Sequence, residues 1–253
     1  MGRIKNILVS QPVPENKKSP YFDLAEKYNL KVDFRSFIHV EGVSVKDFRQ
    51  EKVDIAAHTA VIFNSKTAID HFFRIAEEMR VAISDNMKYF CISEATAFYL
   101  QKYIVYRKRK IFYGNSTMED LIEVMQKHKN EKYLVPLSAA HQEEIPRLLT
   151  KNKFHFTKTI LYRTECSDLS DLADVNYDVL VFYSPSGIQS LLKNFPGFIQ
   201  NETKIASFGT KTAKAVKDAG LRLDIMAPQP EAPSMTMALE NFISEYNRVN
   251  GKK

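Results

Sequence analysis

The chain has 253 residues, of which 44% are hydrophobic, and this suits one large domain or two smaller ones and argues against a disordered chain. No apolar run approaches the ~20 residues that span a membrane, and two distant cysteines, Cys91 and Cys166, argue against a disulfide framework or a zinc site. The net charge of +6 is mildly basic, which fits a small anionic metabolite, or nucleic acid if a basic face were present. The N-terminus has too short an apolar run for a secretory signal, so we expect a cytoplasmic protein.

Strands and helices are predicted to alternate along the whole chain. Residues 6–12 read as a strand and 19–30 as a helix, with Ser19 as its cap and Pro20 in its first turn. Residues 31–43 alternate like one exposed, extended strand. Further strand–helix units are predicted at residues 59–79, 88–103, 110–129, 132–152, 177–195 and 204–220, with an extended segment at 156–166 and a last helix at 234–249.

This alternation predicts an α/β fold, in which parallel sheets carry helices on both faces. Ligands of such folds bind beyond the carboxyl ends of the strands. The stretch "IASFGTKTAKAVKDAGL" (residues 205–221) has Gly209, Thr210, Lys211 and Thr212 at such an end. The first amides of a helix can hold an anion there. An ordinary joint with a threonine cap is the alternative for this stretch.

Two motifs recur in the same order and at nearly the same offset. "AVIFNSKTAIDHFF" matches "LVFYSPSGIQSLL", which pairs Ser65 with Ser184, and "YFCISEATAFYLQKY" matches "IASFGTKTAKAVKDAG", which pairs Thr96 with Thr212. The recurrence predicts two similar, flavodoxin-like α/β domains. Two extended segments, at about 32–40 and 157–166, would join them as linker strands. The predicted domains are therefore residues 36–167 and a discontinuous domain of residues 1–35 with 168–253.

Six stretches in order resemble motifs of the uroporphyrinogen-III synthase family, and together they cover nearly the whole chain. They are "VIFNSKTAI", "ISEATAFYL", "VPLSAAHQEEIPRLL", "TILYRT", "VFYSPSGI" and "SFGTKTAKAVKDAGL". The resemblance implies two α/β domains joined by a two-stranded β-ladder, with the active site in the cleft between them. It also implies a monomeric, cytosolic lyase of haem biosynthesis that needs no metal or cofactor.

The implied reaction is the cyclisation of hydroxymethylbilane, a linear tetrapyrrole with eight carboxylates, to uroporphyrinogen III with loss of water and inversion of ring D. Loss of water requires a proton donor, and Tyr162 falls on the family's tyrosine. A tyrosine that merely favours a β-ladder is the other interpretation. The predicted carboxylate-binding residues are Ser65, Thr96, Ser138, Ser184, Ser186, Gly187, Gly209, Thr210, Lys211 and Thr212. Lys211 could instead be an ordinary solvated lysine, and the others apart from Ser138 could instead only cap a helix.

The middle domain departs from the family pattern at several turns. Ser93-Glu94 replaces a glycine and a small residue, Ser138 replaces a glycine, Gln142 an arginine, and Thr67 a basic residue. These departures keep a second hypothesis open: a catalytically weak relative that binds a carboxylate-rich or other anionic ligand as a sensor or regulator. A nucleic-acid-binding protein using the basic stretch "YRKRK" ranks last, because no known module accompanies it. The expected partner is a small molecule, with no nucleic acid and no membrane.

Overall fold

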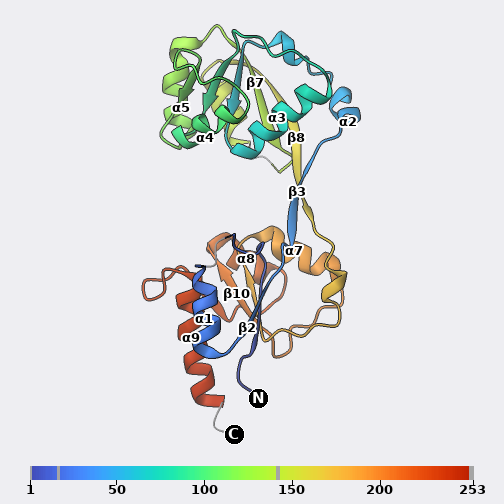
Figure 1. Ribbon diagram of the computed structural model, residues 1–253, viewed down its shortest axis with the longest axis vertical. Helices are drawn as coiled ribbons and strands as arrows, with labels where there is room; N and C mark the ends of the chain where they lie inside the picture. Colours follow the sequence, from blue (N-terminus) through green and yellow to red (C-terminus); the bar gives the residue numbers. More distant parts are fainter. Residues whose placement is uncertain (1, 16–17, 141–142, 251–253) are drawn as a thin grey trace. The chain divides into compact units, whose positions relative to one another are not determined.

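The structure is a computed structural model that describes residues 2–15, 18–140 and 143–250 (Figure 1). The chain divides into two compact units: unit 1 comprises Met1–His39 with Glu165–Lys253, and unit 2 comprises Val40–Thr164. Each unit is a sheet of mainly parallel strands between two layers of helices, so the predicted fold class is confirmed. None of the helices in the described ranges is both long and apolar enough to cross a membrane.

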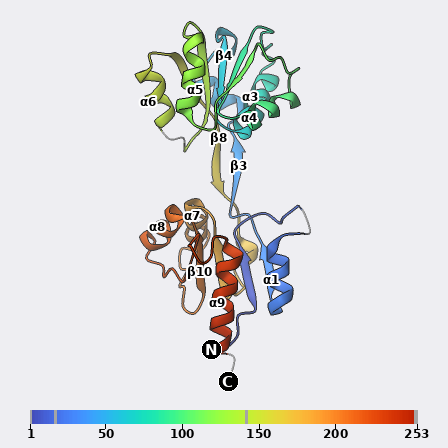
Figure 2. The same cartoon turned by 90° about the vertical axis from the view of Figure 1, so that its left-hand side faces the viewer.

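Unit 1 contains a five-stranded sheet in the order β2-β1-β9-β10-β11. Its strands are β1 (Asn6–Val9), β2 (Lys31–Phe34), β9 (Val179–Phe182), β10 (Lys204–Phe208) and β11 (Ile225–Ala227), all parallel. Figure 2 shows α1 (Pro20–Tyr28) and α9 (Met235–Asn250) on one face, and α7 (Pro185–Asn194) and α8 (Thr210–Asp218) on the other. Side chains of β9 alternate between the two apolar layers, with Val179 and Val181 under α1 and α9, and Leu180 and Phe182 under α7 and α8.

Unit 2 contains a six-stranded sheet in the order β3-β8-β7-β4-β5-β6. Its strands are β3 (Ile38–Gly42), β4 (Ala60–Phe63), β5 (Lys88–Cys91), β6 (Ile111–Tyr113), β7 (Lys132–Ser138) and β8 (His155–Cys166). One face is covered by α3 (Lys66–Glu78) and α4 (Glu94–Tyr99), with α2 (Val45–Gln50) beside them, and the other by α5 (Met118–Met125) and α6 (Glu144–Lys151). Cys91 is fully buried in this core, and burial raises the pKa of its thiol to about 12, so it serves as a small hydrophobe.

The two sheets have the same spatial order of strands, but the chain begins each sheet at a different strand. If β9, β10 and β11 are matched with β4, β5 and β6, then β1 and β2 match β7 and β8, and the two strand orders coincide. The N-terminal β1–α1–β2 of unit 1 thus corresponds to the late β7–α6–β8 of unit 2. This explains why the sequence repeat begins inside the chain and not at its N-terminus.

The extended segment 31–43 is two strands, where the sequence pattern predicts one. β2 ends at Phe34 because its partner β1 ends at Val9. β3 begins at Ile38 and is the neighbour of β8 in the other sheet. The sequence alternates between polar and apolar residues through both strands, so it holds no signal for the change of partner. Both β3 and β8 cross from one unit to the other.

Candidate functional site

The first group of predicted residues follows β9 in unit 1. Ser184 precedes α7, and its Oγ accepts a hydrogen bond from the Gly187 amide at 3.2 Å. A Cβ at Gly187 would lie 3.2 Å from the Phe182 ring, so a larger residue would push this ring away. Ser186, in the first turn, is half-buried. Ser184 is therefore a helix cap, and it brings the first turn of α7 to the carboxyl end of β9.

The second turn of unit 1 joins β10 to α8 and leaves its first amides without a cap. Gly209 has a φ of +84°, a conformation that favours glycine, and no side chain among the described residues caps α8. The threonine cap considered as an alternative is therefore wrong. The first intrahelical hydrogen bond runs from the Ala213 amide to the Gly209 carbonyl at 3.0 Å. The amides of Thr210, Lys211 and Thr212 precede it and have no acceptor within the helix.

The exposure of these three residues differs. Thr210 and Lys211 are exposed, whereas Thr212 is buried beneath them. β9 and β10 are parallel neighbours, so the turns that follow them share one edge of the sheet. The positive end of the α8 dipole, the open amides and the Lys211 ammonium all favour an anion at this edge.

A pair of tyrosines at the same edge was not predicted. The hydroxyls of Tyr183, which directly precedes Ser184, and Tyr21, at the start of α1, are 2.7 Å apart. Burial raises the pKa of both hydroxyls, most strongly that of Tyr21, so both remain protonated at neutral pH. Two protonated hydroxyls share one hydrogen bond, which leaves a second proton that can be donated elsewhere. No sequence signal links two residues so far apart.

In unit 2, the structure brings Ser65 and Tyr162 together. Ser65 caps α3 by accepting a hydrogen bond from the Ala68 amide at 3.1 Å, and its Oγ is also 3.1 Å from the Tyr162 hydroxyl. Tyr162 is on β8 and is 8% exposed. Its hydroxyl therefore lies at the carboxyl end of β4, beside the first turn of α3.

His71 and Arg74, neither of which was predicted, hold the other side of Tyr162. The His71 ring stacks on the Tyr162 ring with centroids 5.3 Å apart and planes 16° apart. Arg74 Nε donates a hydrogen bond to His71 Nδ1 at 3.2 Å, and its Nη2 donates to the Val43 carbonyl at 2.7 Å. Burial, and then the charge of Arg74, lower the pKa of His71, so its imidazole is neutral at neutral pH. The spacing of these residues on α3 was the available signal, since i and i+3 share a helix face.

The turn after β5 carries the departure from the family pattern at Glu94. Ser93 caps α4, and its Oγ lies 3.3 Å from the Thr96 amide and 3.0 Å from Thr96 Oγ1. Thr96 is buried. The Glu94 carboxylate accepts a hydrogen bond from the Tyr113 hydroxyl at 3.0 Å. Glu94 is thus bonded to a side chain of β6, which satisfies one of its oxygens without a cation.

The last predicted residue of unit 2, Ser138, ends β7 and pairs with Tyr162 of β8 across a register shift. It also lines a cavity of about 510 Å³ together with Asn64, whose buried Oδ1 has no hydrogen-bond partner among the described residues. Gln142 lies outside the described residues. The described residues contain no group of three or more His, Cys, Asp or Glu side chains arranged to hold a metal ion.

Comparisons with known proteins bear directly on this arrangement. The family model of uroporphyrinogen-III synthase HemD matches residues 20–237. No curated protein matches the chain. Among solved structures, uroporphyrinogen-III synthetase from Helicobacter pylori is 17% identical, with a TM-score of 0.61 over 96% of this chain and 100% of that one. A mutant uroporphyrinogen III synthase from the extremely thermophilic bacterium Thermus thermophilus is 13% identical, with a TM-score of 0.52 over 96% and 99% of the two chains.

The fold and its polar turns define a two-unit α/β protein with candidate anion sites at the carboxyl ends of its strands. The chain belongs to the uroporphyrinogen-III synthase family, since the family model matches most of its length. The resemblance found in the sequence is thereby confirmed. Members of this family are lyases of haem biosynthesis that act on a tetrapyrrole.

Proposed function

We propose that this chain cyclises hydroxymethylbilane to uroporphyrinogen III, with loss of water and inversion of ring D. Family membership supports the reaction. The observation that carries it is the Tyr162 hydroxyl, 3.1 Å from Ser65 Oγ, at the strand edge where α/β proteins bind ligands. We also propose that the protein acts as a cytoplasmic monomer without metal or cofactor.

In this mechanism, Tyr162 is the acid that protonates the departing hydroxyl of the bilane. The C–O bond then breaks, water leaves and a carbon cation remains. The carbon of ring D that already carries the bridge to the neighbouring ring attacks this cation, and the bond to that bridge then breaks, which leaves a cation on the bridge carbon. The unsubstituted carbon of ring D attacks this second cation, so the macrocycle closes with ring D inverted. The attacking carbon loses a proton, and this proton restores the acid. Ser65 is able to relay protons to Tyr162, because either hydroxyl of the pair can donate. The neutral, stacked His71 fixes the Tyr162 ring without placing a positive charge beside the developing cation.

Carboxylate binding would fall to the turns. The open amides of Thr210, Lys211 and Thr212 offer donors whose positions are fixed by α8, and the exposed Thr210 hydroxyl and Lys211 ammonium extend the set. Holding a flexible chain by its acid groups brings the reacting ends together, so much of the catalysis would be orientation.

A coupled assay tests the proposal. Hydroxymethylbilane is generated in place by its synthase, and the products are oxidised and separated as type I and type III isomers, with and without EDTA. Excess type III in both conditions is expected. Only the spontaneous type I isomer would contradict the reaction, and type III that disappears with EDTA would contradict the metal independence.

The second hypothesis, a sensor or regulator that binds an anionic ligand, is distinguished by the same experiment. Glu94 adds a negative charge at a turn proposed to bind carboxylates, and this observation favours weak activity. Binding of the bilane without type III product would support the sensor. Catalytic formation of the type III isomer, with many bilane molecules converted per protein molecule, would exclude a sensor or regulator as the main function.

A further inference from the structure

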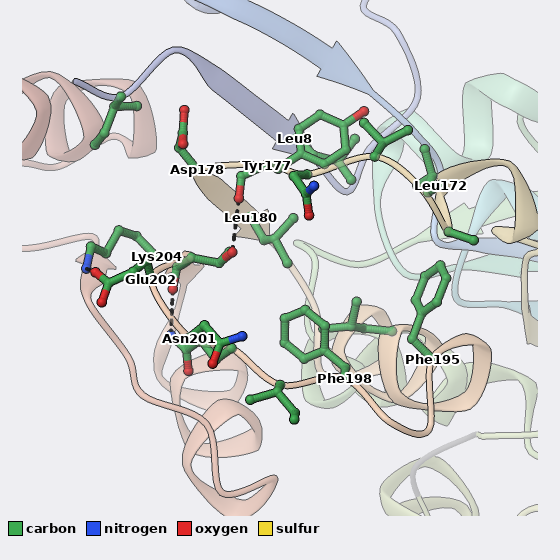
Figure 3. Close-up of a pocket in the computed structure, with 18 of the residues that line it drawn as sticks. Leu8, Leu172, Tyr177, Asp178, Leu180, Phe195, Phe198, Asn201, Glu202 and Lys204 are labelled. Atoms are coloured by element: carbon green, nitrogen blue, oxygen red, sulfur yellow. Dashed lines mark hydrogen bonds and ion pairs between the residues drawn. The ribbon is translucent and has the colours of Figure 1, made fainter. Parts of the chain in front are cut away.

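Unit 1 has a cavity at the edge of its sheet opposite to the turns described above. This cavity of about 730 Å³ is bordered by residues at the amino ends of the strands, such as Ile4 before β1, Asp178 before β9 and Lys204 at the start of β10 (Figure 3). All of its lining residues belong to unit 1. Its volume lies in the range of small-molecule sites.

Part of the floor and part of the rim of this cavity are apolar. Leu8 and Leu180 form part of the floor, and Phe198 lies across from them (Figure 3). The rims expose two aliphatic side chains, Val175 at 42% and Ile199 at 74%. Apolar groups exposed at the hollow lose contact with water when a ligand fills it, which favours binding.

The polar groups around the hollow are largely bonded within the protein. The Asp178 carboxylate accepts from the amides of Lys5 and Asn6 at 2.7 and 2.9 Å. The Tyr177 hydroxyl donates to Asp33 at 3.0 Å. The Gln200 amide donates to the Thr203 carbonyl at 3.0 Å. These groups fix the walls, and none of them needs a ligand to be satisfied.

Two cations at the hollow remain available. Arg3 is exposed and forms no hydrogen bond or ion pair with any described residue. The Lys204 side chain is only 13% exposed, and its Nζ is 3.9 Å from the carboxylate of Glu202, whose side chain is 71% exposed. A contact of 3.9 Å is too long for a hydrogen bond, so this pair is loose, and the Lys204 Nζ also lies over the Tyr246 ring, 5.6 Å from its centroid. Figure 3 shows Lys204 at one end of the hollow and Phe195 at the other.

We propose that this hollow is a binding site for a small apolar anion, an aromatic or acyl group carrying one acid function. The hydrocarbon part lies on Leu180 and Phe198, and the acid group meets Lys204 and Arg3. The site is separate from the turns of the proposed reaction, so its occupancy can be measured without bilane.

Two fluorescent probes that share an aromatic body test this proposal. Anilinonaphthalene sulfonate carries one acid group, and N-phenyl-1-naphthylamine is its uncharged counterpart. We expect the sulfonate to bind to the folded, full-length protein with a stoichiometry of one, and about fivefold more tightly than the uncharged probe at low salt. Lys204→Met should remove most of this difference.

A steric variant locates the binding. A Cβ at Gly197, which lines the hollow, meets no atom within 4 Å, so Gly197→Trp adds an indole beside the hollow without a clash at its Cβ. Lys217→Trp, on exposed α8 surface outside the hollow, is the matched control. We expect Gly197→Trp to lose at least tenfold in affinity for both probes and Lys217→Trp to bind as the natural chain does.

Ile199→Glu gives a second variant whose folding is not in question, because this side chain is largely exposed. It places a negative charge on the rim and should weaken the sulfonate more than the uncharged probe. Absence of one-site binding, or equal affinities of natural chain and Gly197→Trp, would overturn the site. Equal affinities of the two probes would overturn its preference for an anion.

Discussion

Tyr162 combines a hydroxyl that contacts Ser65 with a ring that stacks on His71, and the two parts can be separated by mutation. Tyr162→Phe keeps the stacked ring and removes the proton donor. We expect turnover to fall by about tenfold or more, with little change in thermal stability. The coupled assay and a thermal melt measure the two effects.

The control for this variant is Tyr89→Phe, another tyrosine whose ring packs in the unit 2 core. It should leave turnover unchanged. If Tyr162→Phe also retains full turnover, Tyr162 has a structural role in β8 and another group must protonate the leaving hydroxyl.

The neutral His71 gives a pH dependence to stability. Its pKa is lowered from 6.5 by burial and by Arg74, although Asp70 acts in the opposite direction. The unfolded chain therefore binds the proton at a higher pH than the folded chain. Stability should fall as the pH drops through about 6.5 and level off below the folded pKa of His71.

Thermal melts between pH 5 and 8 test this sign. His71→Gln cannot take up the proton, so its stability should fall less than that of the natural chain over the same range. His155→Gln, at an exposed position on β8, is the control. Parallel pH profiles for the natural chain and His71→Gln would show that another group is responsible.

The site residues that were predicted contact residues close to them in the sequence, and those that were missed contact residues far away in the sequence. Ser65 and Ser184 were predictable because a cap and the amide it accepts from are three residues apart. The stack of His71 on Tyr162 and the pair of Tyr21 with Tyr183 join distant parts of the chain. Such contacts depend on the order of strands in the sheet, and single residues carry no signal of it.

At the scale of elements, Gly209 is the joint that fixes the direction in which α8 leaves the sheet. Gly209→Ala places a Cβ at a φ of +84°, which is strained even though the space around it is open. We expect a loss of about 1 kcal/mol in the free energy of unfolding, and weaker bilane binding if the backbone relaxes by moving the open amides. Urea unfolding and the KM in the coupled assay measure these changes.

Gly197→Ala is the matched control, because its added Cβ also meets open space but its φ is ordinary. It should be neutral or slightly stabilising. Equal losses in the two variants would mean that backbone strain is not what glycine avoids at position 209.

The elements themselves were largely predictable, because strand and helix patterns are local. The strands that precede the polar turns are short, largely buried runs. β4 and β9 are fully buried, and each is followed, after one residue, by a serine. The division of residues 31–43 into β2 and β3 was not predictable. It depends on where β1 ends and on which sheet supplies the next partner, and both are properties of the folded molecule.

At the scale of the whole molecule, unit 2 is one continuous piece of chain with its own apolar layers. Both of its core clusters consist of residues between Val43 and Tyr162. We expect residues 40–164 alone to fold and to unfold in urea in one cooperative transition. Residues 165–253 alone lack β1 and β2 and should not. A non-cooperative transition in the first fragment would show that it depends on unit 1.

The two sheets have the same strand order, but the chain begins each of them at a different strand. This difference determines the order in which the two units can fold during synthesis. Unit 2 is complete when residue 164 has left the ribosome, whereas β1 must wait for its partner β9, which begins at Val179. At usual rates of translation this wait is on the order of ten seconds. Throughout it, one edge of β1 is unpaired and α1 lacks its contacts with α9. The first segment to be made is thus among the last to be buried, and it is the part of the nascent chain that a chaperone would have most reason to hold.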